Sequence, residues 1–160
     1  MSSIVKATIN NAEITAAIIS ASNKDVAKQF NLNQDNNPKH PSFCTKDWVL
    51  FDFERGVEYF LFEEEGAYIG CVAYESPRPD TAYLNRLSVL PQSRERGIGE
   101  QLTKHIIAHS RSNKIKYISI GIIAAHSKLK DWYLKLGFIE TETKDLPHLP
   151  FDVTYMRFEL

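Results

Sequence analysis

The sequence predicts one domain of the α/β or α+β class, in which helices flank a mixed, mostly antiparallel β-sheet. Along its 160 residues, apolar patterns with helical and strand periodicity alternate in the order strand, two helices, three strands, helix, strand, helix, two strands. Glu64, Glu65 and Gly66 lie between two apolar runs and predict an antiparallel hairpin. The strand–helix–strand unit through residues 98–109 requires a parallel pair, because its helix carries the chain back across the sheet. We therefore expect a sheet of about seven strands.

Each element follows from its local pattern. The expected helices cover residues 11–30 (two helices broken near Asn23), 46–56, 97–110 and 127–137. The expected strands cover residues 3–9, the two hairpin arms within 57–76, and 81–90, 116–126, 138–143 and 151–160. In the first helix, an apolar stripe is expected to face the core and consists of Ile14, Ala17, Ile18 and Ala21. Residues 31–45 are rich in Asn and Pro, and a loop of this length is typical of a binding or covering segment.

Composition excludes several classes of function. The net charge of −1 gives no general attraction for nucleic acid or an anionic membrane, so an anion site has to be local. Apolar runs fall short of the ~20 residues of a membrane span, and the N-terminus lacks a basic-then-apolar export signal. We expect a cytoplasmic protein with no membrane and no nucleic-acid partner. Cys44 and Cys71 lack CxxC spacing and are expected to be reduced thiols rather than a disulfide or a metal site.

A glycine-containing turn provides the strongest functional signal, in the stretch RLSVLPQSRERGIGEQL. It joins a predicted strand to a predicted helix, whose first N–H groups lack partners and carry partial positive charge. Gly97 and Gly99 leave these amides bare, and Arg94 and Arg96 add donors suited to phosphate oxygens. A P-loop is excluded because GxxxxGK[ST] is absent, and a dinucleotide fingerprint is excluded because Leu102 replaces its third glycine.

The pattern from Arg94 to Gly99 resembles the acyl-CoA-binding motif of the GNAT superfamily, [QR]-x-x-G-x-[GA] after a strand. The segment GIIAAHSKLKDWYLKLGFIET resembles the next motif of that superfamily, which ends in Y-x-x-x-G-F, here Tyr133, Gly137 and Phe138. The resemblance covers nearly the whole chain, taken as a single domain over residues 1–160. It implies the acyl-CoA N-acyltransferase fold, with a splayed strand pair that forms the coenzyme cleft. It also implies acetyl-CoA as co-substrate and no metal.

The resemblance carries roles to individual residues. Backbone groups of Leu87 and Val89 are expected to contact the pantetheine arm, and His126 stands where the family often has an asparagine with the same role. Tyr133 holds the position of the acid that protonates the departing thiolate, and a neutral phenol suits this task. The pyrophosphate is expected at the amides of the turn, which belong to Arg94, Glu95, Arg96, Gly97, Ile98, Gly99 and Glu100.

The group that deprotonates the attacking amine stays open. Many members of the superfamily carry a glutamate on the strand before the turn. Here strict alternation directs toward the cleft four residues without a carboxylate, Tyr83, Asn85, Leu87 and Val89. The remaining hypotheses are Glu75, His126, His148, or a water chain held by Asn85 and Tyr83.

The sequence thus predicts an N-acetyltransferase that transfers acetyl from acetyl-CoA to a primary amine of a small molecule by direct attack. The alternatives are a non-catalytic acyl-CoA-binding or sensing module and a protein-modifying acetyltransferase. A homodimer paired through the closing strands is left open. His105 and His109 have the i, i+4 spacing of a metal pair, but Ile106 replaces the glutamate of HExxH. Packing against the core is therefore favoured for both histidines.

Overall fold

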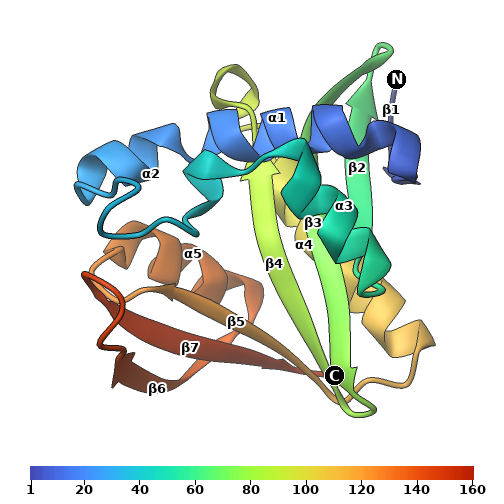
Figure 1. The fold of residues 1–160 in the computed structure, drawn as a ribbon. Helices are drawn as coiled ribbons and strands as arrows, with labels where there is room; N and C mark the ends of the chain where they lie inside the picture. The colour runs from blue at the N-terminus through green and yellow to red at the C-terminus, as the bar shows by residue number, and fades with distance from the viewer.

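The computed structural model describes residues 1–160 and contains one seven-stranded sheet with helices on both faces (Figure 1). The sheet order is β1-β2-β3-β4-β5-β7-β6. The strands are β1 Ser2–Lys6, β2 Glu58–Glu64, β3 Ala67–Arg78, β4 Thr81–Val89, β5 Tyr117–Ile123, β6 Ile139–Asp145 and β7 Asp152–Glu159. The helices are α1 Ala12–Ser22, α2 Lys24–Gln29, α3 Lys46–Glu54, α4 Ile98–Ser112 and α5 Ser127–Leu136. The predicted elements are confirmed in type and order.

Only one strand pair in the sheet is parallel. β4 and β5 run in the same direction, as the intervening helix α4 requires, and every other neighbouring pair is antiparallel. The predicted hairpin joins β2 to β3 through Glu65 and Gly66, which both have positive φ values. The mixed, mostly antiparallel sheet is therefore confirmed.

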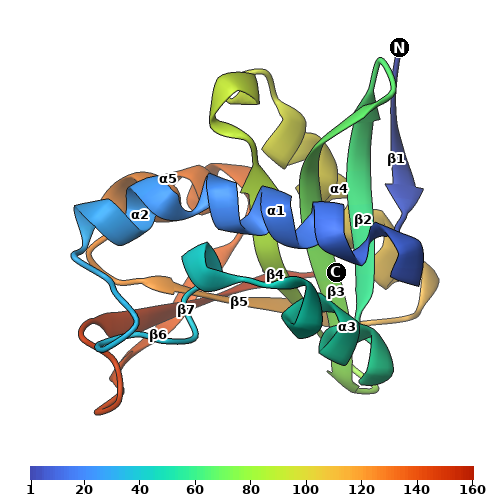
Figure 2. The ribbon, with the colours of Figure 1, turned by 45° about the horizontal axis from the view of Figure 1, so that its top comes forward.

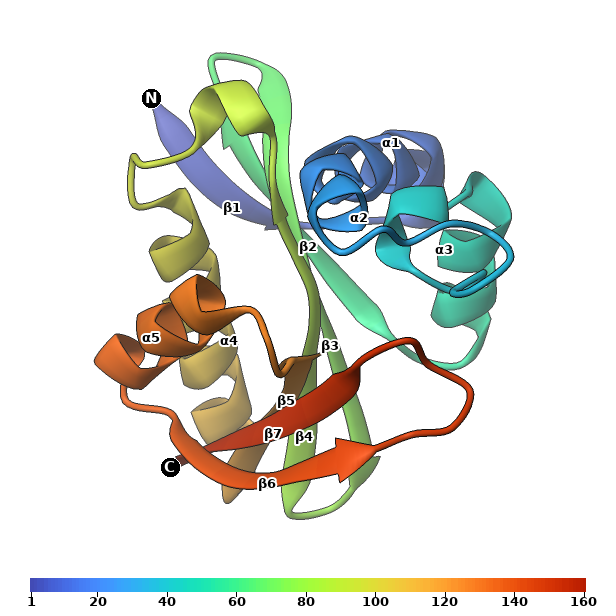
Figure 3. The same cartoon turned by 90° about the vertical axis from the view of Figure 1, so that its left-hand side faces the viewer.

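The sheet separates two hydrophobic cores. One core lies under α1 and α3, and the other lies under α4 and α5. These two pairs of helices lie on opposite sides of the sheet (Figure 3). Fully buried side chains on alternating positions of β2 supply both cores, because successive strand residues face opposite sides. Tyr59 and Leu61 belong to the α1–α3 core, whereas Phe60 and Phe62 belong to the α4–α5 core. Cys44 and Cys71 are free and buried.

The predicted apolar stripe of α1 is confirmed only at Ile18, which is buried. Ile14 and Ala17 are exposed, and the buried face includes Ala16 and Ile19 beside Ile18. Alanine and isoleucine occur on nearly every side of this helix, so periodicity alone does not single out one face. The packing of α1 against the sheet determines which face of the helix is buried.

Three-residue 3₁₀ helices occur at Ile9–Asn11, Pro41–Phe43 and Pro91–Ser93. The second lies within the Asn- and Pro-rich segment 31–45, which otherwise consists of turns and irregular chain, as expected. None of the helices has both the length and the apolar character that crossing a membrane demands.

Candidate active site

β4 and β5 pair over only three residues and then separate. The parallel register joins residues 81–83 to residues 117–119, and no pairing continues beyond Tyr83 and Ser119. The two strands diverge toward their C-terminal ends in both views of the ribbon (Figure 1, Figure 2). The predicted splayed strand pair is thus present, and it leaves the β5-facing edge of β4 without a strand partner.

A β-bulge at Arg86 changes which side chains face each side of the splay. Arg86 has a φ of 53°, and the register with β3 moves from Ala73↔Asn85 to Cys71↔Ser88, which leaves one extra residue in β4. Such a bulge reverses the alternation beyond it. The prediction that one face carries Tyr83, Asn85, Leu87 and Val89 is therefore wrong.

Beyond the bulge, Leu87 and Val89 pack against the α4–α5 core. Asn85 and Arg86 instead line a pocket on the α3 side of the sheet. The carbonyl oxygen of Val89 accepts a hydrogen bond from Arg94 Nε at 3.3 Å. The extra residue thus places a guanidinium group beside Asn85 on the α3 side.

The turn between β4 and α4 presents a row of unpaired amides. Glu95 has a φ of 64° and Gly97 a φ of 79°, and Gly97 immediately precedes α4. None of the backbone N–H groups from Glu95 through Glu100 donates a hydrogen bond to another part of the chain. A Cβ atom at Gly97 would meet nothing within 4 Å. Bare amides at the positive end of a helix form a binding site for an anion.

The two arginines of the turn are held by carboxylates. Arg94 donates to Asp25 Oδ2 at 2.6 Å and to the carbonyl oxygen of Ser22 at 2.6 Å, and the hydrogen bond from Arg94 lowers the pKa of Asp25. Arg96 donates to Glu64 at 2.6 and 2.8 Å. Their positive charges are therefore balanced within the protein. The amides of the turn, by contrast, have no acceptor within the protein.

Tyr133 is buried in the α4–α5 core, which Leu87 and Val89 also contact. Its ring lies edge-on to Trp132 at 5.0 Å and to Phe138 at 5.2 Å. Its hydroxyl group makes no hydrogen bond to the protein, and burial raises its pKa, so the phenol keeps its proton at neutral pH. The Trp132 ring lies 3.4 Å from the position of a Cβ atom on Gly99, which brings α5 against the start of α4.

His126 and His148 lie in different surroundings. The half-buried ring of His126 precedes α5 and lies 5.6 Å from the ring of Phe30. Burial lowers the pKa of His126, more than the nearby Asp25 raises it, so the imidazole is neutral at pH 7. His148 is exposed in the segment between β6 and β7. The structure therefore brings neither histidine into the pocket beside Asn85.

The pocket beside Asn85 has a volume of about 320 Å³ and is lined by charged side chains. It includes Gly121 of β5, so it extends across the gap between the separating strands. The sequence points to Glu75 and Asn85 in this wall, whereas no motif marks its other charged residues. The polar and charged residues of its wall are Asp52, Arg55, Tyr59, Glu75, Asn85 and Arg86.

Asp52 is the centre of an ion-pair network in this wall. Its Oδ2 atom accepts from Arg86 Nη1 at 2.8 Å and from the Tyr59 hydroxyl at 2.6 Å. Its Oδ1 atom accepts from Arg55 Nη2 at 2.9 Å. Arg55 also donates to both carboxylate oxygens of Glu75 at 3.3 Å. Burial raises the pKa of Tyr59, which therefore stays protonated and donates to Asp52.

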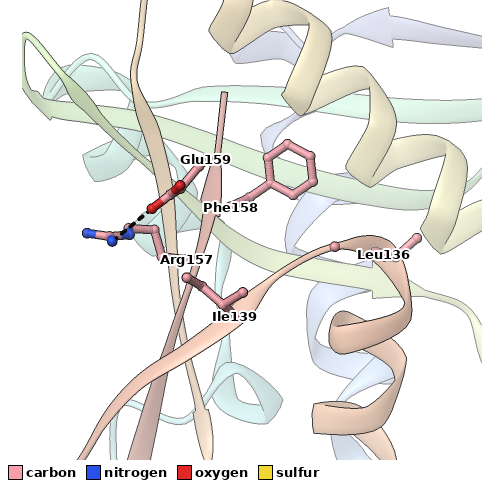
Figure 4. A pocket seen from close by; sticks show the side chains of 6 residues that line it. Leu136, Ile139, Arg157, Phe158 and Glu159 are labelled. Carbon is pink, nitrogen blue, oxygen red and sulfur yellow. Dashed lines mark hydrogen bonds and ion pairs between the residues drawn. The ribbon is translucent and has the colours of Figure 1, made fainter.

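A second hollow of about 370 Å³ lies between the end of α5 and strands β6 and β7 (Figure 4). Its Arg157 is paired with Glu159 at 3.0 Å and stacks on Tyr117. Glu159 pairs in register with Tyr117, which places this hollow at the closed end of the β4–β5 splay. The hollow is thus remote from the separating strand ends.

His105 and His109 pack on aromatic rings, as the sequence favoured. The His105 ring lies 4.6 Å from the ring of Phe60, and the His109 ring lies 4.6 Å from that of Tyr74. His109 Nε2 also contacts Glu58 Oε2 at 2.8 Å. Both side chains therefore stabilise the contact between α4 and the sheet.

A family model described as the acetyltransferase (GNAT) family matches residues 25–138, which is more than half of the chain. The chain belongs to this family. A protein named amino-acid acetyltransferase from Ralstonia nicotianae is 31% identical over 96 residues, which are 59% of this chain and 20% of that protein. The matched region therefore spans about a fifth of the length of that relative.

Solved GNAT structures confirm the predicted fold. The PaiA N-acetyltransferase from Thermoplasma acidophilum in complex with coenzyme A aligns with a TM-score of 0.85 at 17% identity, covering 100% of this chain and 99% of that chain. A GNAT family acetyltransferase from Elizabethkingia anophelis with acetyl-CoA bound aligns with a TM-score of 0.71 at 17% identity, covering 99% of this chain and 98% of that chain. The acyl-CoA N-acyltransferase architecture is thus shared over essentially the full chain.

Proposed function

We propose that this GNAT protein transfers the acetyl group of acetyl-CoA to a primary amine of a small molecule. The observation that carries the proposal is the row of unpaired amides from Glu95 to Glu100, which follows the separated end of β4. The pocket beside Asn85 reaches the same strand separation from the α3 side. A coenzyme and an acceptor can therefore approach one reaction centre from opposite sides of the sheet.

The amides of the turn fit the pyrophosphate of coenzyme A, because they are bare, consecutive and located at a helix N-terminus. In the family, backbone groups of the splayed strand contact the pantetheine arm, and these belong here to Leu87 and Val89. The separation of β4 from β5 leaves this edge of β4 without a strand partner. Backbone donors at such an edge stabilise negative charge that develops on the acyl oxygen.

Tyr133 is the proposed acid. As the amine nitrogen forms its bond to the acyl carbon, the carbon–sulfur bond breaks and the sulfur leaves as a thiolate. The Tyr133 hydroxyl has no competing protein acceptor and donates its proton to this sulfur. The resulting phenolate regains a proton from water before the next turnover.

Glu75 is the proposed acceptor of the amine proton, directly or through a water molecule. It is the one member of the three side chains considered from the sequence that lines the pocket, whereas His126 and His148 lie outside it. Asn85 lines the same wall and offers an amide group that can orient the amine or the water. The amine must lose a proton because an ammonium group is not nucleophilic.

A thiol-release assay with acetyl-CoA and a panel of primary amines tests the proposal. We expect thiol release that depends on the amine and an acetylated product with the matching mass. Coenzyme binding without turnover on any acceptor would instead identify a sensing module. Turnover confined to polypeptide amines would identify a protein-modifying enzyme.

A further inference from the structure

Four side chains of alternating charge form consecutive ion pairs in the wall of the acceptor pocket. Arg86 pairs with Asp52, Asp52 pairs with Arg55, and Arg55 pairs with Glu75. The two inner members each contact two partners of opposite charge. This series of ion pairs therefore has a cation, Arg86, at one end and an anion, Glu75, at the other.

Two nitrogen atoms of the Arg86 guanidinium group have no hydrogen-bond acceptor in the protein. Only its Nη1 atom contacts Asp52 and Tyr59, and the guanidinium group lies 5.6 Å from the centre of the Trp48 ring. Its Nε and Nη2 atoms donate to no protein group and are not enclosed by the protein. The side chain is 24% exposed, so the cation is held firmly but remains open to a ligand. A fixed guanidinium group with two free donor nitrogens is suited to a carboxylate.

Glu75, at the other end of the series of ion pairs, can accept further hydrogen bonds. Its two contacts with Arg55 are each 3.3 Å, longer than the 2.8 and 2.9 Å of the ion pairs that Asp52 makes. Ion-paired hydrogen bonds of full strength are about 2.7–2.9 Å long. The side chain is 23% exposed. Its carboxylate can therefore accept further hydrogen bonds from an amine.

We propose that the acceptor is an amino acid, whose carboxylate binds Arg86 and whose amino group lies toward Glu75. This inference rests on the proposed function and specifies its substrate class. At about 320 Å³ the pocket is near the lower end of the ~300–1,000 Å³ range of ligand sites, which favours a free small molecule over a polypeptide. An amino acid in its zwitterionic form has no net charge, so its binding leaves the total charge of the pocket unchanged.

The test compares each L-amino acid with the amine that lacks its carboxylate and with its methyl ester, using acetyl-CoA and thiol release. We expect kcat/KM for the preferred amino acid to exceed that of its two analogues by about 10- to 100-fold, as for loss of a charge-assisted hydrogen bond. Arg86→Gln should abolish this preference, because it should lower kcat/KM far more for the amino acid than for the matching amine. Arg86→Lys should retain an intermediate preference, since it keeps the charge but loses the planar fork.

Arg111→Gln is the matched control, because Arg111 is exposed in the last turn of α4, away from the pocket. It should leave the preference intact. A melting curve and coenzyme affinity measured for Arg86→Gln show whether the variant is folded, and Arg86→Lys provides the comparison if it is not. Turnover of amines without a preference for the carboxylate overturns this inference alone. A preference that survives in both Arg86 variants also overturns it, and absence of turnover on every acceptor overturns it together with the proposed function.

Discussion

The guanidinium group of Arg94 lies 2.6 Å from the carboxylate of Asp25, a residue 69 positions earlier in the chain. A second hydrogen bond joins Arg94 to the carbonyl oxygen of Ser22, at the end of α1. Arg94 thus holds the turn against α1 and α2. We therefore expect it to support coenzyme binding by keeping the amides in place.

Arg94→Ala should weaken coenzyme binding by about 5-fold, because it removes an exposed ion pair and leaves the amides present. Asp25→Asn breaks the same pair from the other side and should weaken binding to a similar extent. Calorimetric titration with coenzyme A measures both. A large loss for Arg94→Ala together with normal affinity for Asp25→Asn would show that the guanidinium group contacts the coenzyme itself.

Gly97→Asp should reduce coenzyme affinity at least 100-fold, since a carboxylate would enter a site that binds a diphosphate. The side chain itself has room, because nothing lies within 4 Å of the Cβ position. The positive φ of 79° costs a non-glycine residue about 1 kcal/mol in stability. Gly97→Ala measures this conformational cost without the charge.

Gly56→Asp is the control for the Gly97 variant. Gly56 has a φ of 89° and is equally unobstructed, but it follows α3 on the other face of the sheet. It should lower the melting temperature to a similar degree and leave coenzyme affinity unchanged. Unchanged affinity in Gly97→Asp would exclude the turn as the diphosphate site.

Tyr133→Phe should lower kcat by about 100-fold and leave coenzyme affinity within about 2-fold. The substitution preserves the ring contacts with Trp132 and Phe138 and removes only a hydroxyl group without a protein partner. The melting temperature should therefore stay close to that of the native protein. Steady-state kinetics with the preferred acceptor, alongside calorimetry, measure the two effects, and full activity would remove Tyr133 from the acid role.

Local signals in the sequence predicted most of the fold because each depends on neighbouring residues. The hairpin follows from Glu65 and Gly66, and the start of α4 follows from Gly97, whose left-handed conformation favours glycine. The strand–helix order then fixes the parallel pair β4–β5. The site turn could likewise be located from its short motif.

The pocket proposed for the acceptor depends on contacts between residues that are far apart in the sequence. The bulge at Arg86 reverses the facing of Leu87 and Val89, and a bulge with a non-glycine residue at positive φ has no local sequence marker here. Asp52 and Arg86 meet across 34 residues. The pocket that they line therefore emerges only from the packing of α3 on the sheet.

Glu75→Gln should lower kcat/KM by about 100-fold or more at neutral pH if the carboxylate receives the amine proton. The effect should shrink as the pH approaches the pKa of the acceptor amine, because the amine then loses its proton to solvent. Arg55→Gln is the matched variant, since it breaks the same 3.3 Å ion pair but keeps the carboxylate. Comparable losses in both variants, with the same dependence on pH, would assign the pair to holding the pocket together. Loss confined to Glu75→Gln, recovering at high pH, would assign the proton transfer to Glu75.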